Sequence, residues 1–245
     1  MDERIGARTA LVTGGSGGIG KACAAKLCEL GYHVVLSARR VDPLRAAADE
    51  IGARYITADA SDPEGFADAI GPLESIDLVV HAAGTLGGTY ARKQTFEQWQ
   101  TIMSANLDSC FVVTAAALPK MRPGSRLVFI SSSAAHEPMM ARTAYSASKA
   151  GMNAFARALA LEVDRDGIAV HIVTPGPVET EMLQDVPFEM NAIAAADVAD
   201  AVAWLDTVDP SVDLPEIRLH AVRRGPFARE PVVPDEVRRR AAQRE

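Results

Sequence analysis

Short apolar runs rich in valine and isoleucine alternate along the chain with longer stretches of helical spacing. The candidate strands are residues 9–13, 33–37, 54–57, 77–81, 126–131, 168–174 and 217–221. The helical stretches between them are residues 19–30, 44–51, 66–70, 96–118, 144–164 and 197–206. This alternation is typical of βαβ units, whose parallel strands are buried on both faces. It predicts an α/β fold: a doubly wound parallel sheet of about seven strands with helices on both faces.

A chain of 245 residues suits one domain of this kind, because no linker or repeat divides it before about residue 225. We predict a single domain over residues 1–224. Residues 225–245 are rich in proline and arginine and read as a charged, solvated C-terminal extension.

Charge and hydropathy exclude several kinds of partner. A net charge of −7 argues against a surface that binds nucleic acid. We expect no membrane partner, because no apolar stretch approaches the roughly 20 residues that span a bilayer. The first residues lack the apolar core of a signal peptide, so we expect a cytoplasmic protein. The three cysteines have no zinc-site spacing, and no metal is predicted.

A glycine-rich turn, TGGSGGIG at residues 13–20, follows the first strand and opens the first helix. Glycines let the backbone turn sharply and approach a pyrophosphate, and the free N–H groups of the helix start attract the anion. Gly14, Gly18 and Gly20 are the expected contributors. A nucleoside triphosphate loop needs a hydroxyl after Lys21, but Ala22 follows. A purely structural turn is the other alternative.

The end of the second strand indicates which dinucleotide is preferred. An acidic residue there would accept hydrogen bonds from the ribose 2′-OH of NAD, but this chain has Ser37, Ala38, Arg39 and Arg40. Two guanidinium groups suit the 2′-phosphate of NADP, and Arg39 is the first choice. The alternative is that both arginines are only solvated.

YSASK at residues 145–149 places Tyr145 and Lys149 four residues apart on one helix face. A free phenol ionises near pH ~10, and a nearby ammonium would lower that pKa enough for proton transfer at neutral pH. Ser132 ends the fifth strand, where a crevice ligand is expected, and could polarise a carbonyl oxygen. Ser131 and Ser133 are rival serines.

With these motifs in this order, the chain resembles the short-chain dehydrogenase/reductase family from residue 8 to about residue 221. TGGSGGIG is similar to the family's TGxxxGxG, HAAG at residues 81–84 to its NNAG, and PGPVET at residues 175–180 to its PGxxxT. The resemblance implies a Rossmann-type fold and a dinucleotide site made of Gly14, Ser16, Gly18, Ile19, Gly20, Arg39, Arg40, Asp59, Ala82, Ala83, Gly84, Tyr145, Lys149, Pro175, Gly176, Val178 and Thr180.

The resemblance also implies a catalytic tetrad of Asn106, Ser132, Tyr145 and Lys149. Tyr145 would be the acid/base, Lys149 its electrostatic partner and a ribose ligand, and Ser132 the carbonyl stabiliser. Asn106 would position a water that links Lys149 to solvent. The implied activity is hydride transfer between NADP(H) and the carbonyl or alcohol of a small or medium substrate.

Some residues depart from the family pattern. His81 and Ala82 replace the asparagines of NNAG, and we expect His81 to be structural. The segment 181–191 is short for a lid, so closure is partial or shared with a neighbour or the tail. Arg142 or His136 is a candidate for a polar group of the substrate; the alternative is that this stretch, with Met139 and Met140, only fills a gap. The last strand is weakly similar to dehydrogenases of 3-hydroxy acids.

Two other functions compete with this interpretation. A catalytically silent dinucleotide sensor or scaffold would be expected to lose the tyrosine or the lysine, and both are present. An epimerase or dehydratase of the extended relatives would need a larger substrate domain after Thr180. Small residues along 144–164 would permit close helix packing, and the resemblance implies a homodimer or homotetramer.

Overall fold

The computed structural model describes residues 8–137, 139–184, 186, 188–209, 211–222 and 228–242. One sheet holds seven strands in the order β3-β2-β1-β4-β5-β6-β9, and every pair in it is parallel. Its strands are β1 (Thr9–Thr13), β2 (His33–Ala38), β3 (Arg54–Thr57), β4 (Leu78–His81), β5 (Arg126–Ile130), β6 (Ala169–Pro175) and β9 (Glu216–Leu219). The predicted parallel sheet is confirmed, and all strand ends lie within two residues of the expected positions.

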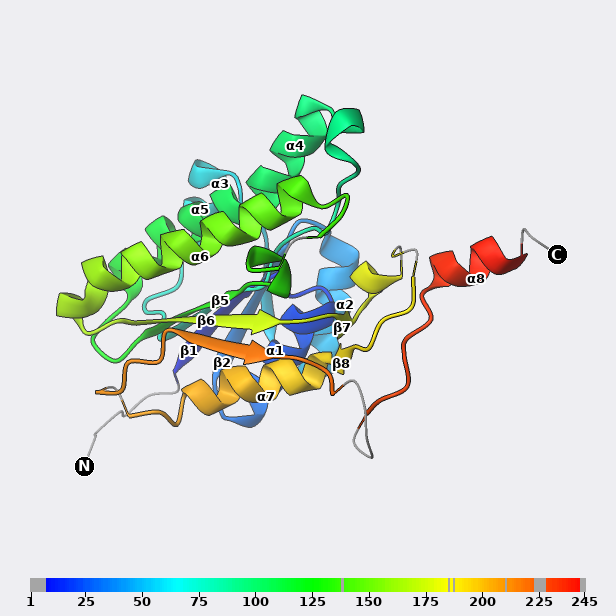
Figure 1. The fold of residues 1–245 in the computed structure, drawn as a ribbon. Coiled ribbons are helices and arrows are strands. Elements are labelled where there is room, and N and C mark those ends of the chain that lie inside the picture. Colours follow the sequence, from blue (N-terminus) through cyan, green and yellow to red (C-terminus); the bar gives the residue numbers. More distant parts are fainter. Residues whose placement is uncertain are drawn as a thin grey trace.

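Helices cover both faces of the sheet, as predicted (Figure 1). The helices are α1 (Gly18–Glu29), α2 (Val41–Ile51), α3 (Pro63–Ile70), α4 (Phe96–Met103), α5 (Ser109–Ala117), α6 (Thr143–Val163), α7 (Ala195–Leu205) and α8 (Asp235–Ala242). The stretch 96–118, predicted as one helix, is interrupted by a π-helical turn, Ser104–Asp108. Such turns are frequent at functional sites, and this one carries Asn106.

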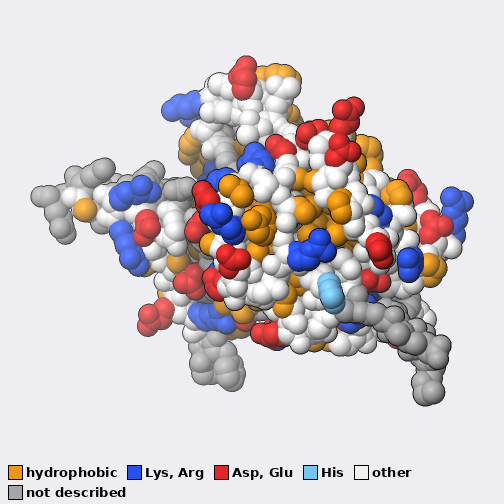
Figure 2. Space-filling model, turned by 180° about the vertical axis from the view of Figure 1, so that it is seen from behind, with side chains coloured by type: hydrophobic (Ala, Val, Ile, Leu, Met, Phe, Trp, Pro, Cys, Tyr) orange, Lys and Arg blue, Asp and Glu red, His pale blue; other side chains and the backbone are white. Residues whose placement is uncertain are grey.

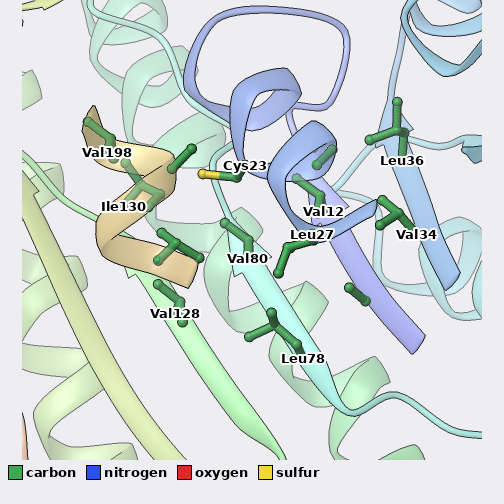
Figure 3. Packing of buried hydrophobic residues seen from close by; sticks show 14 of the residues in the cluster. Val12, Cys23, Leu27, Val34, Leu36, Leu78, Val80, Val128, Ile130 and Val198 are labelled. Carbon is green, nitrogen blue, oxygen red and sulfur yellow. The ribbon is translucent and has the colours of Figure 1, made fainter. Parts of the chain in front are cut away.

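Apolar side chains on alternate strand positions build two separate cores. Val12, Val80 and Val128 point to one face, where they pack with Leu27 of α1 and Val198 of α7 (Figure 3). Their strand neighbours belong to the core of the other face, together with α3, α5 and α6: Leu11, Val79, Leu127, Phe66, Val113 and Met152. A strand side chain of this size contributes about 1.5–3 kcal/mol when fully buried. Strands that are apolar on both faces therefore require helices on both faces.

The expectation that no stretch could span a membrane needs correction. Phe96–Lys120 is long and apolar enough by length and composition, although 44% of its most apolar window is buried in the protein. Cys110, Val113 and Ala117 of this stretch are at most 2% exposed and face the sheet core. A core helix of this kind passes the same test, so the stretch is weak evidence for a membrane span. On the face that Figure 2 shows, basic and acidic side chains are interspersed.

A small second sheet and the C-terminal segment lie beyond the strand ends. β7 (Val178–Glu179) pairs with β8 (Ile193–Ala194), and residues 181–184, 186 and 188–192, here called the lid, lie between them in the chain. Met190 of the lid forms an antiparallel bridge with Val232, and α8 projects away from the body (Figure 1). The predicted domain boundary at residue 225 lies outside the described residues. The described part of the extension, residues 228–242, contacts the lid through the bridge at Val232 and through Asp235, whose N donates to Gln184 Oε1 at 3.2 Å.

Candidate active site

The carboxyl ends of the parallel strands meet at one edge of the sheet, where the strand order reverses between β1 and β4. Doubly wound sheets bind ligands in the crevice at this position. The crevice here opens into a cavity of about 640 Å³. Predicted site residues that line it are Ile19, Ser132, Tyr145, Pro175, Gly176, Val178 and Thr180.

The glycine turn between β1 and α1 leaves no room for side chains at two positions. Gly14 has φ +69°, and a Cβ there would lie 2.7 Å from the carbonyl oxygen of Ala82. A Cβ at Gly20 would collide with the carbonyl oxygen of Gly14. The turn is also tied to β2, since Gly15 N donates to Ser37 O at 3.2 Å. Backbone atoms therefore fix the shape of this cradle.

The start of α1 is free to bind an anion. Gly17, its N-cap residue, makes no side-chain capping bond, and the first turn carries no acidic residue. Ser16, Gly18 and Ile19 stand at this end, with Gly18 facing the methyl group of Thr180. The hydroxyl of Ser37, at the end of β2, is buried with no partner among the described residues. These residues fit the pyrophosphate and ribose of a dinucleotide.

Arg39 and Arg40 are exposed between β2 and α2. Asp59 follows β3, and its carboxylate accepts bonds from the backbone N (2.9 Å) and hydroxyl (2.7 Å) of Ser61. These bonds, and the charge of Arg39, lower the pKa of Asp59. Arg39 therefore stands near Asp59, beside a strand end that carries no carboxylate. This arrangement fits the adenosine end of a dinucleotide.

Asn106 is fully buried and holds the chain that follows β4. Its Oδ1 accepts from Thr85 N at 2.8 Å, and its Nδ2 donates to Thr85 O (3.0 Å) and to the Ser148 hydroxyl (3.1 Å). Ala82, Ala83 and Gly84 occupy the start of this segment, and Ala83 N donates to the Thr13 hydroxyl at 3.2 Å. Asn106 thus braces this segment against α6.

Tyr145 and Ser132 both line the cavity, one from α6 and one from the end of β5. Burial raises the pKa of the Tyr145 phenol, while the Ser132 hydroxyl and the Arg142 charge lower it, and the net direction is upward. A phenol in this state carries its proton at neutral pH. Ser131 also lines the cavity, with a buried hydroxyl that has no partner among the described residues.

Lys149 is 5% exposed, and its Nζ donates to the carbonyl oxygen of Ile130 at 2.8 Å. Burial lowers its pKa to about 8, because a dry environment disfavours the charged form. The expectation that Lys149 lowers the pKa of Tyr145 is not met in this structure, where the lowering groups are Ser132 and Arg142. A buried ammonium needs an acceptor, and the last carbonyl of β5 supplies it.

The segment after β6 forms the wall opposite the glycine turn. Gly176 N donates to Leu219 O at 2.7 Å, and the Thr180 hydroxyl donates to Val178 O at 3.3 Å. Pro177 O accepts from Ile193 N at 3.0 Å, which joins this wall to the lid. The polar backbone of this wall fits the carboxamide end of a nicotinamide.

Neither His81 nor His136 lines the cavity. His81 is buried, stacks on Phe129 at 4.3 Å between ring centroids, and has its pKa lowered to about 3 by burial and by Lys149. His136 Nε2 lies 2.7 Å from Glu216 Oε1. The suggestion that His136 meets the substrate therefore loses support, because Glu216 holds its ring. No group of three metal-ligating side chains is present within the described ranges.

Sequence reasoning did not assign several contributors to the pocket region. Leu86, Thr89 and Tyr90 line the cavity from the segment after HAAG, and Val232 of the extension packs on the lid residues Leu183 and Val186. The glycine pair at residues 87–88 marks an irregular segment, but nothing in the sequence locates its partner. The contact of Val232 joins residues too distant in the chain for a local pattern to show.

Known proteins resemble the chain over most of its length. Residues 8–191 match the family model described as short chain dehydrogenase. An acetoacetyl-CoA reductase of Shinella zoogloeoides is 36% identical over 187 residues, which are 74% of this chain and 78% of that protein. The solved structure of actinorhodin polyketide ketoreductase with NADPH has a TM-score of 0.78 and 28% identity, covering 86% of this chain and 95% of that one. A short chain dehydrogenase from Burkholderia cenocepacia in complex with NADP has a TM-score of 0.79 and 26% identity, covering 87% and 96%.

Proposed function

The chain belongs to the short-chain dehydrogenase family of oxidoreductases, and on that premise we propose that it transfers a hydride between NADP(H) and the carbonyl or alcohol carbon of a small or medium substrate. One observation carries the proposal. The Tyr145 phenol and the Ser132 hydroxyl face one cavity at the strand ends, between the glycine turn and the wall formed by residues 175–180.

In the direction of carbonyl reduction, Tyr145 acts as the general acid. Its pKa is raised by burial, so the phenol holds the proton that the carbonyl oxygen needs as negative charge develops. Ser132 donates a hydrogen bond to the same oxygen and polarises the carbonyl. Lys149 adds positive charge beneath the site and is the proposed ribose ligand. Asn106 joins α6 to the segment after β4. We propose that it also positions a water that links Lys149 to solvent.

NADP(H), when bound, supplies or accepts the hydride. The residues proposed to hold its pyrophosphate are Gly14, Ser16, Gly18, Ile19 and Gly20 of the glycine turn. Arg39 and Arg40 would bind the 2′-phosphate, and Asp59 would contact the adenine. Ala82, Ala83 and Gly84 would line the ribose side, and Pro175, Gly176, Val178 and Thr180 the nicotinamide. Two relatives solved with NADP or NADPH support this preference over NAD.

A turnover assay tests the proposal. The purified protein should oxidise NADPH faster than NADH with at least one carbonyl compound from a panel of aldehydes, ketones and oxo acids. Tyr145→Phe should reduce turnover by about 10²–10⁴-fold, the range that general acid catalysis supplies. NADPH binding, measured by fluorescence, should persist in this variant. Tyr55→Phe, on β3 and 38% exposed, is the matched control. Full turnover in Tyr145→Phe would remove the assigned role.

We also propose that the protein forms a homodimer or homotetramer through α5 and α6. Phe111 of α5 is 60% exposed, and Leu161 of α6 is 84% exposed. Three small residues, Ala147, Ala154 and Ala158, are also exposed along α6. Small residues permit the close approach of a second helix. The double variant Phe111→Glu/Leu161→Glu should have a sedimentation coefficient closer to that of a monomer. An unchanged coefficient would exclude this face as the subunit interface.

The proposed location is the cytoplasm. Cys23 and Cys110 are buried free thiols, which suits a reducing compartment. Fractionation of the source cells should recover the protein with other cytoplasmic enzymes. Recovery in the membrane fraction would contradict this.

A further inference from the structure

Arg142 is the one side chain with a net charge at neutral pH among the described residues that line the cavity. The surrounding wall is mostly apolar or thioether in character: Leu86, Met139, Leu183, Val186, Phe188 and Met190. A guanidinium next to such a wall is costly unless an anion compensates its charge. The occupant of this cavity therefore decides whether Arg142 is compensated.

The bonding of Arg142 leaves most of its hydrogen-bonding capacity unused. The side chain is half-buried, and its Nη1 donates to Gly88 O at a long 3.3 Å. No ion pair of Arg142 is present within the described part of the chain, and a guanidinium carries five N–H donors. The planar group is thus available to bind a carboxylate through two parallel bonds.

The backbone before Arg142 is strained. Ala141 has φ 60°, the left-handed region, and no other described residue except glycine has a positive φ. This conformation costs about 1 kcal/mol or more and commonly persists at ligand sites. Arg142 itself is the N-cap residue of α6, three positions before Tyr145. Both residues line the cavity, and the charge of Arg142 acts on the Tyr145 phenol, so both side chains can reach one small molecule.

We propose that Arg142 binds a carboxylate of the substrate, so that the enzyme selects short oxo acids whose carboxylate lies a few bonds from the reacting carbonyl. The carbonyl step of this inference rests on the function proposed above. Recognition of the anion rests on the cavity alone. The apolar wall accommodates the remainder of the substrate, and Arg142 acts as the specificity-determining residue.

Two matched pairs of probes test the inference: acetoacetate with methyl acetoacetate, and levulinate with methyl levulinate. Each pair keeps the carbon chain and removes the charge. The measured quantity is the ratio of kcat/KM for the acid to kcat/KM for the ester. Arg142→Gln keeps a donor for Gly88 O but loses the charge, and Arg142→Lys keeps the charge without the planar fork. Arg165→Gln, on the exposed turn after α6, is the control.

The acid-to-ester ratio should fall by about tenfold or more in Arg142→Gln, as expected for loss of a charge-assisted hydrogen bond. It should fall less in Arg142→Lys and stay unchanged in Arg165→Gln. A ratio within twofold of the unsubstituted protein in Arg142→Gln, for both pairs, would overturn the inference and leave the proposed function standing.

Binding separates this inference from the proposed function. Calorimetric titration of the same probes into Tyr145→Phe with NADPH present needs no turnover. Acids should bind more tightly than esters, and the difference should disappear in Tyr145→Phe/Arg142→Gln. Such binding without turnover in the unsubstituted protein supports Arg142 and contradicts hydride transfer. The role of Arg142 is overturned if acids and esters bind equally, or if none of the four probes binds.

Discussion

The two ends of the cleft are built in different ways. At the proposed dinucleotide end, backbone packs closely on backbone. Gly14 lies against Ala82 O and Gly20 against Gly14 O, and Gly15 N donates a hydrogen bond to Ser37 O of β2. At the substrate end, two strands of two residues, a bridge between Met190 and Val232, and a small apolar cluster hold the lid. The first end has no space for an added atom at Gly14 or Gly20, whereas the second consists mainly of side-chain contacts.

This difference fits the two tasks that we propose for the site, binding a dinucleotide and binding a substrate. A rigid backbone cradle can bind the same dinucleotide in every turnover, because its shape does not depend on side-chain rotamers. A lid of methionine, leucine and valine can change with the substrate, because such side chains repack at small cost. Substitutions at the two ends should therefore have effects of different size and kind.

The largest effect is expected for Gly14→Ala. Alanine would have to adopt the φ of +69° found at this position, which L residues rarely adopt, and its Cβ would lie 2.7 Å from Ala82 O, a clash that no rotamer relieves. Strain and overpacking of about 2–4 kcal/mol would weaken dinucleotide binding by more than about 30-fold. A Cβ at Gly17 would meet nothing within 4 Å, so Gly17→Ala should fold normally. Fluorescence titration with NADPH measures the difference, and tight binding by Gly14→Ala would contradict the rigid cradle.

The next effect concerns the choice of dinucleotide. Arg39→Ala removes the guanidinium that lies beside Asp59 and leaves the backbone cradle intact. The ratio of NADPH affinity to NADH affinity should fall by about tenfold, the size expected for one charge-assisted contact to a phosphate. Arg54→Ala, exposed at the start of β3, should leave that ratio unchanged. An unaltered ratio in Arg39→Ala would mean that this arginine is only solvated.

A smaller effect should follow from the burial of Lys149. Its pKa is about 8 in the folded protein, below the ordinary 10.5, so the unfolded chain binds more protons between these values. The free energy of unfolding therefore rises with pH across that window, and the destabilisation by the buried ammonium is largest at pH values below it. Relative to Lys149→Met, the unsubstituted protein should gain about 1 kcal/mol between pH 7 and pH 9. Urea unfolding measures this difference in free energy between the two proteins. A difference that does not change with pH would show that the Lys149 ammonium is solvated.

The smallest effect is expected at the lid. Val232→Asp places a charge against Leu183 and Val186, which should loosen the lid and raise the KM of the substrate about two- to fivefold, equivalent to ~0.5–1 kcal/mol. Dinucleotide affinity should not change. Val222→Asp, at a position that is 53% exposed, is the control. Loss of NADPH binding in Val232→Asp would show that the two ends are coupled.

Most of the sheet could be predicted because the central strands β1, β2, β4, β5 and β6 are largely apolar on both faces, a local pattern that does not depend on their partners. The edge strand β9 was less well placed, ending at Leu219 rather than residue 221, because its side chains are half-buried or exposed. The break in the helix over 96–118 was missed, because a single π-helical turn is too short to change the apolar spacing; in the structure its residue Asn106 bonds to Thr85 and Ser148. β7 and β8 are too short to have a periodicity.

The same distinction applies to the site. The glycine turn and the YSASK helix could be located from the sequence, because their chemistry requires fixed residues at short spacing. The state of Lys149 could not be predicted, because its pKa depends on burial beneath β5 and on the Ile130 carbonyl. His136 was assigned to the pocket from its position in the chain, yet Glu216, eighty positions away, holds its ring.

The sequence alone therefore determined the class of fold, the order of the strands along the chain and the residues that we propose bind a dinucleotide and move a proton. The tertiary structure decided which charged groups are buried, which side chains line the cavity and how the C-terminal segment contacts the lid. The reason is physical. Periodicity and turn chemistry act over a few residues, whereas desolvation and electrostatic pairing depend on every group that folding brings within a few ångströms.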